Sequence, residues 1–175
     1  EAILYEVKDN ILTITLNRPE KLNAFNFNMQ SDLIDAIDKA NNDDEVKAII
    51  VTGAGRGYCA GADLSAGKDT FNMEAREDRK GAISENGEID WSHSGVRDGG
   101  GRVTLKMFEC LKPIISACNG PAVGVGITMQ LAMDIRLASE QAKYGFVFAR
   151  RGLVPEACSS WFLPRIVGVS KALEW

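Results

Sequence analysis

Backbone amide groups in residues 119–134, NGPAVGVGITMQLAMD, are the groups of this chain best placed to do chemistry. The apolar residues 113–118 before them predict a strand, and Pro121 prevents its continuation because proline has no N–H to donate to a sheet. Two further glycines then lead into apolar residues at helical spacing. A helix that begins on glycines leaves its first N–H groups without partners and without side chains over them. Such donors suit a ligand oxygen that carries negative charge.

Cysteine and histidine chemistry has little support in the sequence. Cys59, Cys110, Cys118 and Cys158 have no CxxC spacing, and His93 is the single histidine. A zinc site and a Ser–His or Cys–His nucleophile system are therefore both unexpected. We predict no bound metal ion, free thiols in a reducing compartment, and a surface position for the histidine.

Nucleotide-binding motifs are not matched by the glycines of this chain. Tyr58 and Met129 stand where two GxGxxG-like segments need their third glycine. Asp69 follows Gly67-Lys68 where a phosphate-binding loop needs serine or threonine. We therefore do not expect a nucleotide phosphate to be bound by any of these three segments.

Around these groups, the first third of the chain predicts the element order β, β, α, β. Alternating apolar residues over 3–7 and 12–16 predict a hairpin with one buried face. An apolar stripe over 29–40 predicts a helix, for which Asn26 or Asn28 is the expected N-cap. The apolar run 46–52 predicts a strand that is covered on both faces.

The last third predicts shorter elements. We expect a helix at 103–111, strands at 113–118 and 135–138, a strand or loop at 143–148, a helix from Glu156 to Ile166, and a further helix capped by Ser170. Because only five residues follow that cap, and so short a helix is not stable alone, we expect the protein to continue beyond Trp175.

Residues 65–102 are polar and charged, with one weak helical pattern near 72–80. A long segment of this kind is either a surface loop or a cover over an active site, and both interpretations stay open. The helix at 103–111 is expected to begin where this segment ends.

Composition indicates one soluble globular domain over residues 1–175. The chain is 45% hydrophobic and 25% charged, and its formal net charge is −4. This charge gives no support to nucleic-acid binding, and no apolar run is long enough to span a membrane. We expect a cytoplasmic protein, or one of an organelle matrix if a targeting segment has been removed before Glu1.

Three segments together resemble the enoyl-CoA hydratase/isomerase, or crotonase, superfamily: RPEKLNA at 18–24, GYCAGADL at 57–64 and NGPAVGVG at 119–126. The resemblance covers essentially the whole chain. It implies an α/β fold built as a spiral of repeated β-β-α units, with a further C-terminal helical segment beyond these residues. It also implies an acyl-CoA thioester ligand, no cofactor other than the CoA of the substrate, and a homotrimer or a dimer of trimers.

The same resemblance implies two catalytic amides. The N–H groups of Ala62 and Val125 would form an oxyanion hole, which stabilises the enolate of the thioester. Glycine is common at the second position, so valine adds bulk near the acyl group. Residues implied to bind the substrate are Leu22, Asn23, Ala24, Ala60, Ala62, Asp63, Leu64 and Val125. The alternative is that the glycines beside these amides serve close packing alone.

The family's hydratases use two glutamates to activate water, and Thr128 and Phe148 occupy those positions here. Neither side chain is a base at neutral pH, so water addition by that mechanism is not expected. The segment VPEACSS at 154–160 instead resembles the Δ3,Δ2-enoyl-CoA isomerase branch, which implies Glu156 as the single base. Alternatively, this glutamate only occupies the first turn of a helix, where the dipole favours acids.

We therefore expect an enzyme that shifts the double bond of a 3-enoyl-CoA to give the 2-enoyl-CoA. Two alternatives stay open. One is another crotonase reaction, such as thioester hydrolysis or decarboxylation, that uses a carboxylate of Glu74, Glu77 or Asp78. The other is an acyl-CoA-binding protein without catalytic activity.

Overall fold

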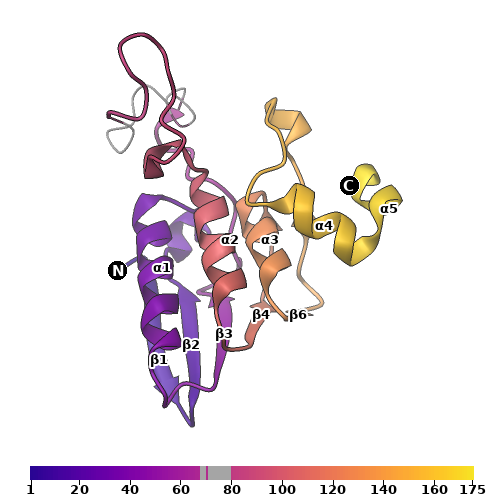
Figure 1. Ribbon diagram of the computed structural model, residues 1–175. Helices are drawn as coiled ribbons and strands as arrows, with labels where there is room; N and C mark the ends of the chain where they lie inside the picture. The colour runs from indigo at the N-terminus through magenta and orange to yellow at the C-terminus, as the bar shows by residue number, and fades with distance from the viewer. Residues whose placement is uncertain (68–69, 71–79) are drawn as a thin grey trace.

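A five-stranded sheet with strand order β1-β2-β3-β4-β6 forms the centre of the computed structural model, which describes residues 1–67, 70 and 80–175 (Figure 1). The first two strands are antiparallel and the other neighbours are parallel. The predicted hairpin is confirmed. The strands are β1 (Ile3–Lys8), β2 (Ile11–Leu16), β3 (Ala48–Gly53), β4 (Ile114–Cys118) and β6 (Ile135–Ala138).

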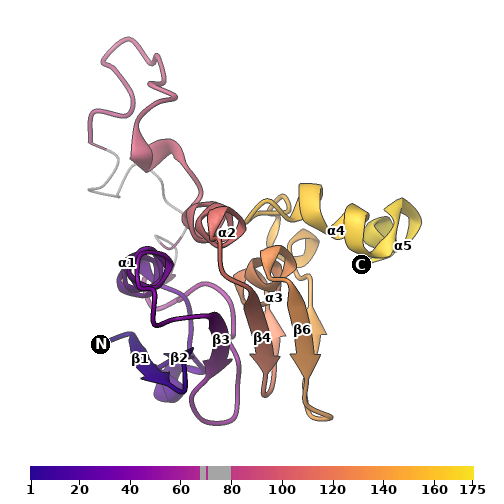
Figure 2. The same ribbon diagram turned by 60° about the horizontal axis from the view of Figure 1, so that its bottom comes forward.

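Two long helices, α1 (Phe27–Asn41) and α2 (Gly99–Glu109), cover one face of this sheet (Figure 2). The predicted stripe of α1 is buried against the sheet, and Asn26 is its N-cap, because its side chain accepts the Met29 N–H at 2.9 Å. The helix predicted at 103–111 begins earlier, at Gly99. Glycines disfavour a helix, but the side chain of Asp98 caps this first turn, so the helix forms there.

The third strand was expected to be covered on both faces, and its two faces are covered unequally. In β3 the side chains of Ile49 and Val51 are completely buried under the helices, whereas Ile50 on the opposite face is only partly buried. The second sheet is small and contains only β5 (Ala122–Val123) and β7 (Tyr144–Gly145) among the described residues.

The helix expected after the glycine turn is short. It consists of α3 (Val125–Thr128), which continues as one turn of 3-10 helix, η5 (Met129–Ala132). Its residues are almost all buried, so this turn is a rigid part of the core. The other 3-10 helices among the described residues are η1 (Pro19–Lys21), η4 (Ser94–Val96) and η6 (Ala149–Arg151).

The C-terminal helices α4 (Ser159–Val167) and α5 (Val169–Glu174) extend sideways from the sheet, beyond β6 (Figures 1 and 2). The helix predicted from Glu156 therefore begins three residues later. The expected cap at Ser170 is wrong, because Gly168 is the N-cap of α5. No helix of the described ranges has the length and apolar character that a membrane span requires.

Candidate active site

Two glycine-containing segments lie side by side next to the small sheet. Cys59 and Ala122 form a parallel bridge, and the Val123 N–H donates to the Cys59 carbonyl oxygen at 3.0 Å. The backbones are so close further on that a Cβ atom on Gly61 would lie 2.9 Å from the Val123 carbonyl oxygen. Gly61 also has a φ angle of 95°, which other residues avoid. Glycine is therefore required at this position.

This bridge brings two backbone amides to equivalent positions. Ala62 follows Cys59 by three residues, and Val125 follows Ala122 by three residues. Neither of the two N–H groups donates a hydrogen bond to another residue in the described part of the chain. Val125 opens α3, where no carbonyl lies one turn earlier to accept its N–H. Both residues line the same cavity, so that cavity has two backbone donors without protein partners.

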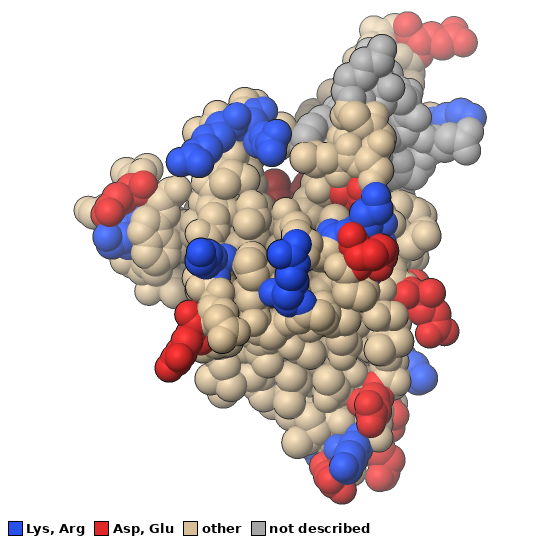
Figure 3. Space-filling model, turned by 180° about the vertical axis from the view of Figure 1, so that it is seen from behind, with Lys and Arg blue, Asp and Glu red and all other residues tan. Residues whose placement is uncertain are grey.

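The cavity has a volume of about 1040 Å³, which is at the upper end of the range for small-molecule sites. Apolar side chains form much of its wall, and they include Phe25, Phe27, Phe148 and Leu153. Figure 3 shows acidic side chains recessed in a hollow of the surface beside the projection that carries η6, and basic side chains over that projection. The site therefore combines an apolar interior with a few polar groups.

Three carboxylates of the described residues line this cavity, and two of them are already paired. Asp63 forms an ion pair with Arg18 at 2.7 Å. Asp98 accepts hydrogen bonds from the N–H groups of Gly101 at 2.7 Å and Ala157 at 2.8 Å, and a longer one from Gly100. These three N–H groups hold the Asp98 carboxyl group in a fixed position. Glu156 is the third.

Glu156 lies in a tight turn before α4 rather than inside the helix. Its carbonyl oxygen accepts the Ser159 N–H at 2.9 Å, and Ala157 and Cys158 both have left-handed backbone angles, with φ of 51° and 57°. The alternative that this glutamate merely occupies a first helical turn is therefore wrong. Asp98 braces the turn through the Ala157 N–H, so the glutamate is positioned by the N-terminus of α2.

The Glu156 carboxyl group has one bonded oxygen and one without a hydrogen-bond partner in the described residues. The Thr128 hydroxyl is 2.7 Å from Oε1. Oε2 lies directly over Gly100, where an added Cβ atom would be 2.6 Å away, so only glycine leaves room for the carboxyl group. Burial raises the pKa of Glu156 to about 7, the Thr128 hydrogen bond lowers it, and the negative charge of Asp98 raises it. Such a group gains and loses a proton near neutral pH.

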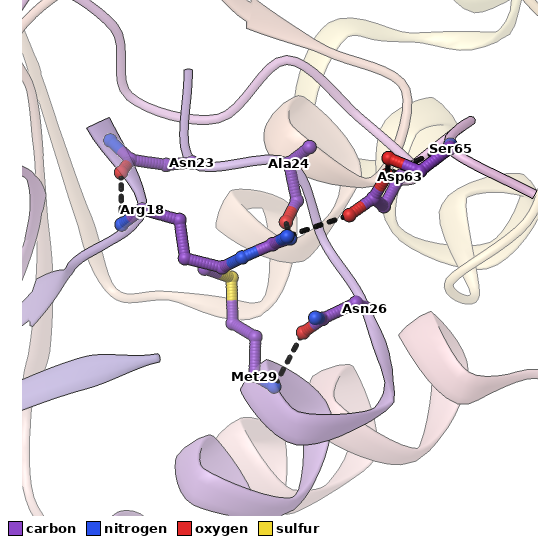
Figure 4. A network of polar contacts seen from close by, with 7 residues as sticks. All are labelled: Arg18, Asn23, Ala24, Asn26, Met29, Asp63 and Ser65. Carbon is purple, nitrogen blue, oxygen red and sulfur yellow. Dashed lines mark hydrogen bonds and ion pairs between the residues drawn. The ribbon is translucent and has the colours of Figure 1, made fainter. Parts of the chain in front are cut away.

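A network of polar contacts around Arg18 joins the loop after β2 to Asp63 (Figure 4). The Arg18 guanidinium donates to the Ala24 carbonyl oxygen at 2.5 Å and to Asp63 at 2.7 Å. The Arg18 backbone N–H donates to the Asn23 side chain at 2.8 Å. The ion pair thus links the loop after β2 to the residue that directly follows Ala62.

We expect Asp63→Asn to lower the free energy of unfolding by about 2 kcal/mol, because it breaks a charge-assisted hydrogen bond between two mostly buried side chains. Hydrogen bonds from Ser65 and then the contact with Arg18 lower the pKa of Asp63 to about 2. Its contribution is therefore present above the ordinary value of 3.8 and is lost as pH falls toward 2. Urea unfolding at pH 7 and at pH 3 measures both effects.

The matched control for this measurement is Asp38→Asn. It breaks the Lys106–Asp38 pair, in which the Asp38 side chain is 51% exposed, and we expect a change of about 0.5 kcal/mol or less. Equal losses of stability in the two variants would show that the Arg18–Asp63 pair stabilises the protein no more than the exposed Lys106–Asp38 pair does.

The residues predicted to bind substrate fall into two groups. Ala60, Ala62, Asp63, Leu64 and Val125 line the cavity. The other three, Leu22, Asn23 and Ala24, are not among its lining residues in the described part of the chain.

The loop that contains those three residues has structural contacts. The completely buried Asn23 donates to the carbonyl oxygens of Ala54 and Gly57, and the Leu22 carbonyl oxygen accepts the Ala60 N–H. This loop therefore supports the adjacent cavity wall.

Sequence reasoning missed two polar residues of the site. Thr128 was expected only as a substitution for a glutamate, but it contacts Glu156. Asp98 lies within the polar segment 65–102, for which the sequence predicts no regular element at this position, although an aspartate before three glycines and an apolar stripe is a recognisable N-cap signal. Phe148, the second substituted position, is buried and lines the cavity.

Glu74, Glu77 and Asp78, the carboxylates considered for other reactions, lie outside the described residues, as does the weak helical pattern near 72–80. Among the described residues, no group of three or more His, Cys, Asp or Glu side chains is arranged to hold a metal ion.

Comparisons with known proteins agree on one family. The family model described as enoyl-CoA hydratase/isomerase matches residues 6–175. Over 165 residues the chain is 41% identical to the enoyl-CoA hydratase ACTT3 of Alternaria alternata, covering 94% of this chain and 50% of that protein. It is 35% identical to the 1,2-epoxyphenylacetyl-CoA isomerase of Escherichia coli K12, covering 99% of this chain and 61% of that protein.

Solved structures give the same result. An enoyl-CoA hydratase/isomerase from Pseudoalteromonas atlantica T6c matches with a TM-score of 0.78 and 34% identity, and an enoyl-CoA hydratase from Bacillus anthracis matches with 0.80 and 27%. Each match covers 99% of this chain and 61% of the other. The chain thus spans between half and about three fifths of the length of the relatives named here.

Proposed function

Because the chain belongs to the enoyl-CoA hydratase/isomerase family and has its α/β crotonase fold, we propose that the whole protein shifts the double bond of a 3-enoyl-CoA to give the 2-enoyl-CoA. One observation carries this proposal: Glu156, with its pKa near 7, lies on the wall of the cavity that also contains the unpaired N–H groups of Ala62 and Val125.

The proposed reaction needs one base and a site for negative charge. The ionised Glu156 takes a proton from C2 of the substrate, and the electron pair of that C–H bond moves toward the thioester oxygen to form a dienolate. The N–H groups of Ala62 and Val125 would stabilise this oxygen. The protonated Glu156 then returns the proton at C4, which leaves the double bond between C2 and C3. No proton, electron or atom is gained or lost overall.

Hydration of a 2-enoyl-CoA is the second candidate, because a relative that is 41% identical is named an enoyl-CoA hydratase. The positions of the two family glutamates argue against it. Thr128 has no acid function and Phe148 is an apolar part of the wall, so neither can activate water. Glu156 alone would have to serve both as base toward water and as acid toward carbon.

Incubation of the purified whole protein with a 3-enoyl-CoA tests the proposal, with formation of the conjugated 2-enoyl thioester followed by its absorbance. Hydration of crotonyl-CoA is measured in parallel. Hydration as fast as isomerisation would overturn the isomerase proposal. Binding of acyl-CoA in a calorimeter without turnover of either substrate would favour a binding protein without activity.

We expect kcat/KM for isomerisation to fall about tenfold for each pH unit below the pKa of Glu156, which lies near 7. The base must be ionised in the free enzyme to accept the first proton, so acidification removes the active form. A profile from pH 5.5 to 8.5 measures this. A flat profile across this range would exclude a base with a pKa near 7.

A further inference from the structure

We propose that Thr128 is a positioning residue whose hydroxyl holds the Glu156 carboxyl group in one place whether that group is ionised or carries the proton. The inference rests on the proposed function of Glu156 as proton carrier. A residue that passes a proton from one carbon to another occupies both states in each turnover, so a side chain that positions it must be able to hydrogen-bond to the ionised and to the protonated form.

The geometry around the hydroxyl supplies two alternative partners. Thr128 Oγ1 lies 2.7 Å from Glu156 Oε1 and 3.2 Å from the Gly124 carbonyl oxygen, and the residue is completely buried. A hydroxyl has one hydrogen to donate and can also accept. Thr128 can therefore donate to only one of these two oxygens at a time.

When Glu156 is ionised, the hydroxyl donates to Oε1. The Gly124 carbonyl oxygen is not left without a partner, because it accepts the N–H groups of Ile127 and Thr128, each at 3.0 Å. The hydroxyl is thus free to serve the carboxylate without leaving a buried carbonyl unsatisfied, which would be costly.

When Glu156 is protonated, its carboxyl group, the Thr128 hydroxyl and the Gly124 carbonyl oxygen can still form hydrogen bonds. A proton on Oε2 leaves the hydrogen bond from Thr128 to Oε1 unchanged. A proton on Oε1 reverses it: the acid donates to Thr128 Oγ1, and the hydroxyl turns toward the Gly124 carbonyl oxygen. In neither case does a heavy atom have to move, so the carboxyl group keeps its position over Gly100.

Other ionisable groups surround Glu156 but cannot take over this role. Asp98 from α2 raises the pKa of Glu156 and is itself held by backbone N–H groups. Burial, and in addition the negative charge of Glu156, raises the pKa of the thiols of Cys59 and of Cys158, which lies in the same turn, so both thiols keep their protons near neutral pH. The remaining charged side chains on the cavity wall, within the described residues, are Asp63 and Arg151.

The decisive comparison is Thr128→Val against Thr128→Ser in the whole protein. Valine has nearly the same shape but no hydroxyl, whereas serine keeps the hydroxyl and loses a methyl group. The titration of Glu156 is followed by the carboxylic acid band in pH-dependent infrared difference spectra, and the band is assigned by its loss in Glu156→Gln. This readout requires no turnover, so it tests the inference even if the substrate of the enzyme is a different thioester.

With valine we expect the midpoint of Glu156 to rise by about one pH unit, because the hydroxyl bonds to both forms of the carboxyl group but its hydrogen bond to the ionised form is the stronger one by about that much. We also expect kcat to fall about tenfold with KM changed less than twofold, since Thr128 lies behind the cavity wall. With serine both values stay near those of the unmodified protein.

An unchanged midpoint in Thr128→Val would overturn the inference, and so would a serine variant that shifts as much as the valine variant, because the effect would then be one of packing. If thermal unfolding shows that the valine variant does not fold, Thr128→Ala replaces it in the same comparison. Failure of the proposed function is a separate result: it would appear as absent isomerase activity in the unmodified protein.

Discussion

Replacement of Glu156 by glutamine is expected to lower kcat for 3-enoyl-CoA isomerisation by about 10³-fold, within the range of about 10²–10⁴ that a general base contributes. Glutamine has the same shape and its carbonyl oxygen can still accept the Thr128 hydroxyl, so the turn before α4 is preserved. What is lost is the ability to take up a proton. KM is expected to change little, because the ligand's other contacts remain. Initial rates measured by absorbance over a range of substrate concentrations give kcat and KM.

Glu109→Gln is the matched control for this variant. It makes the same chemical change at the exposed C-terminal end of α2, away from the cavity, and we expect kcat within twofold of the unmodified protein. If Glu156→Gln keeps more than a tenth of the kcat of the unmodified protein while the control is normal, Glu156 is not the base. The reaction would then need another carboxylate.

The second large effect is expected from Val125→Pro, which removes one of the two unpaired N–H groups. Proline is tolerated in the first position of a helix, and Val125 is the first residue of α3. Loss of one oxyanion donor typically lowers kcat by about 10²–10³-fold. The same fall is expected in kcat/KM, because the contact strengthens only as the thioester oxygen gains charge.

The control for the lost side chain is Val125→Ala, which keeps the N–H. The valine side chain is buried beside Gly100, so its truncation is expected to cost about 1 kcal/mol of stability and less than tenfold in kcat. If the proline and alanine variants have the same kcat, the amide of Val125 has no part in catalysis. Circular dichroism and thermal unfolding confirm that both variants are folded.

Glu156→Gln and Val125→Pro change different parts of the same site. Glu156 comes from a turn that is braced by Asp98 on α2, whereas Val125 belongs to a turn that is aligned with Ala62 through the Cys59–Ala122 bridge. Within the part of the chain that the structure describes, the hydrogen bond that joins the two parts is the one between Thr128 on α3 and Glu156. We therefore expect a double variant of Glu156 and Val125 to be less active than either single variant.

The sequence by itself determined the elements whose signals are local. The hairpin followed from alternating apolar residues, and α1 followed from a stripe at helical spacing after the N-cap Asn26. The three motifs identified the family, which the comparisons confirm. Local periodicity is sufficient for such elements because it depends on residues that are close together in the chain.

Tertiary structure alone decided how the site is assembled. The parallel bridge between Cys59 and Ala122, 63 positions apart, sets the two unpaired amides at matching positions. Asp98 reaches across 59 positions to hold the turn at Ala157, and Thr128 reaches across 28 to contact Glu156. Periodicity and turn chemistry carry no information about such pairings, because they depend on how distant segments pack. For the same reason the sequence could name Glu156 as the base but not the contacts with Thr128 and Asp98 that position it.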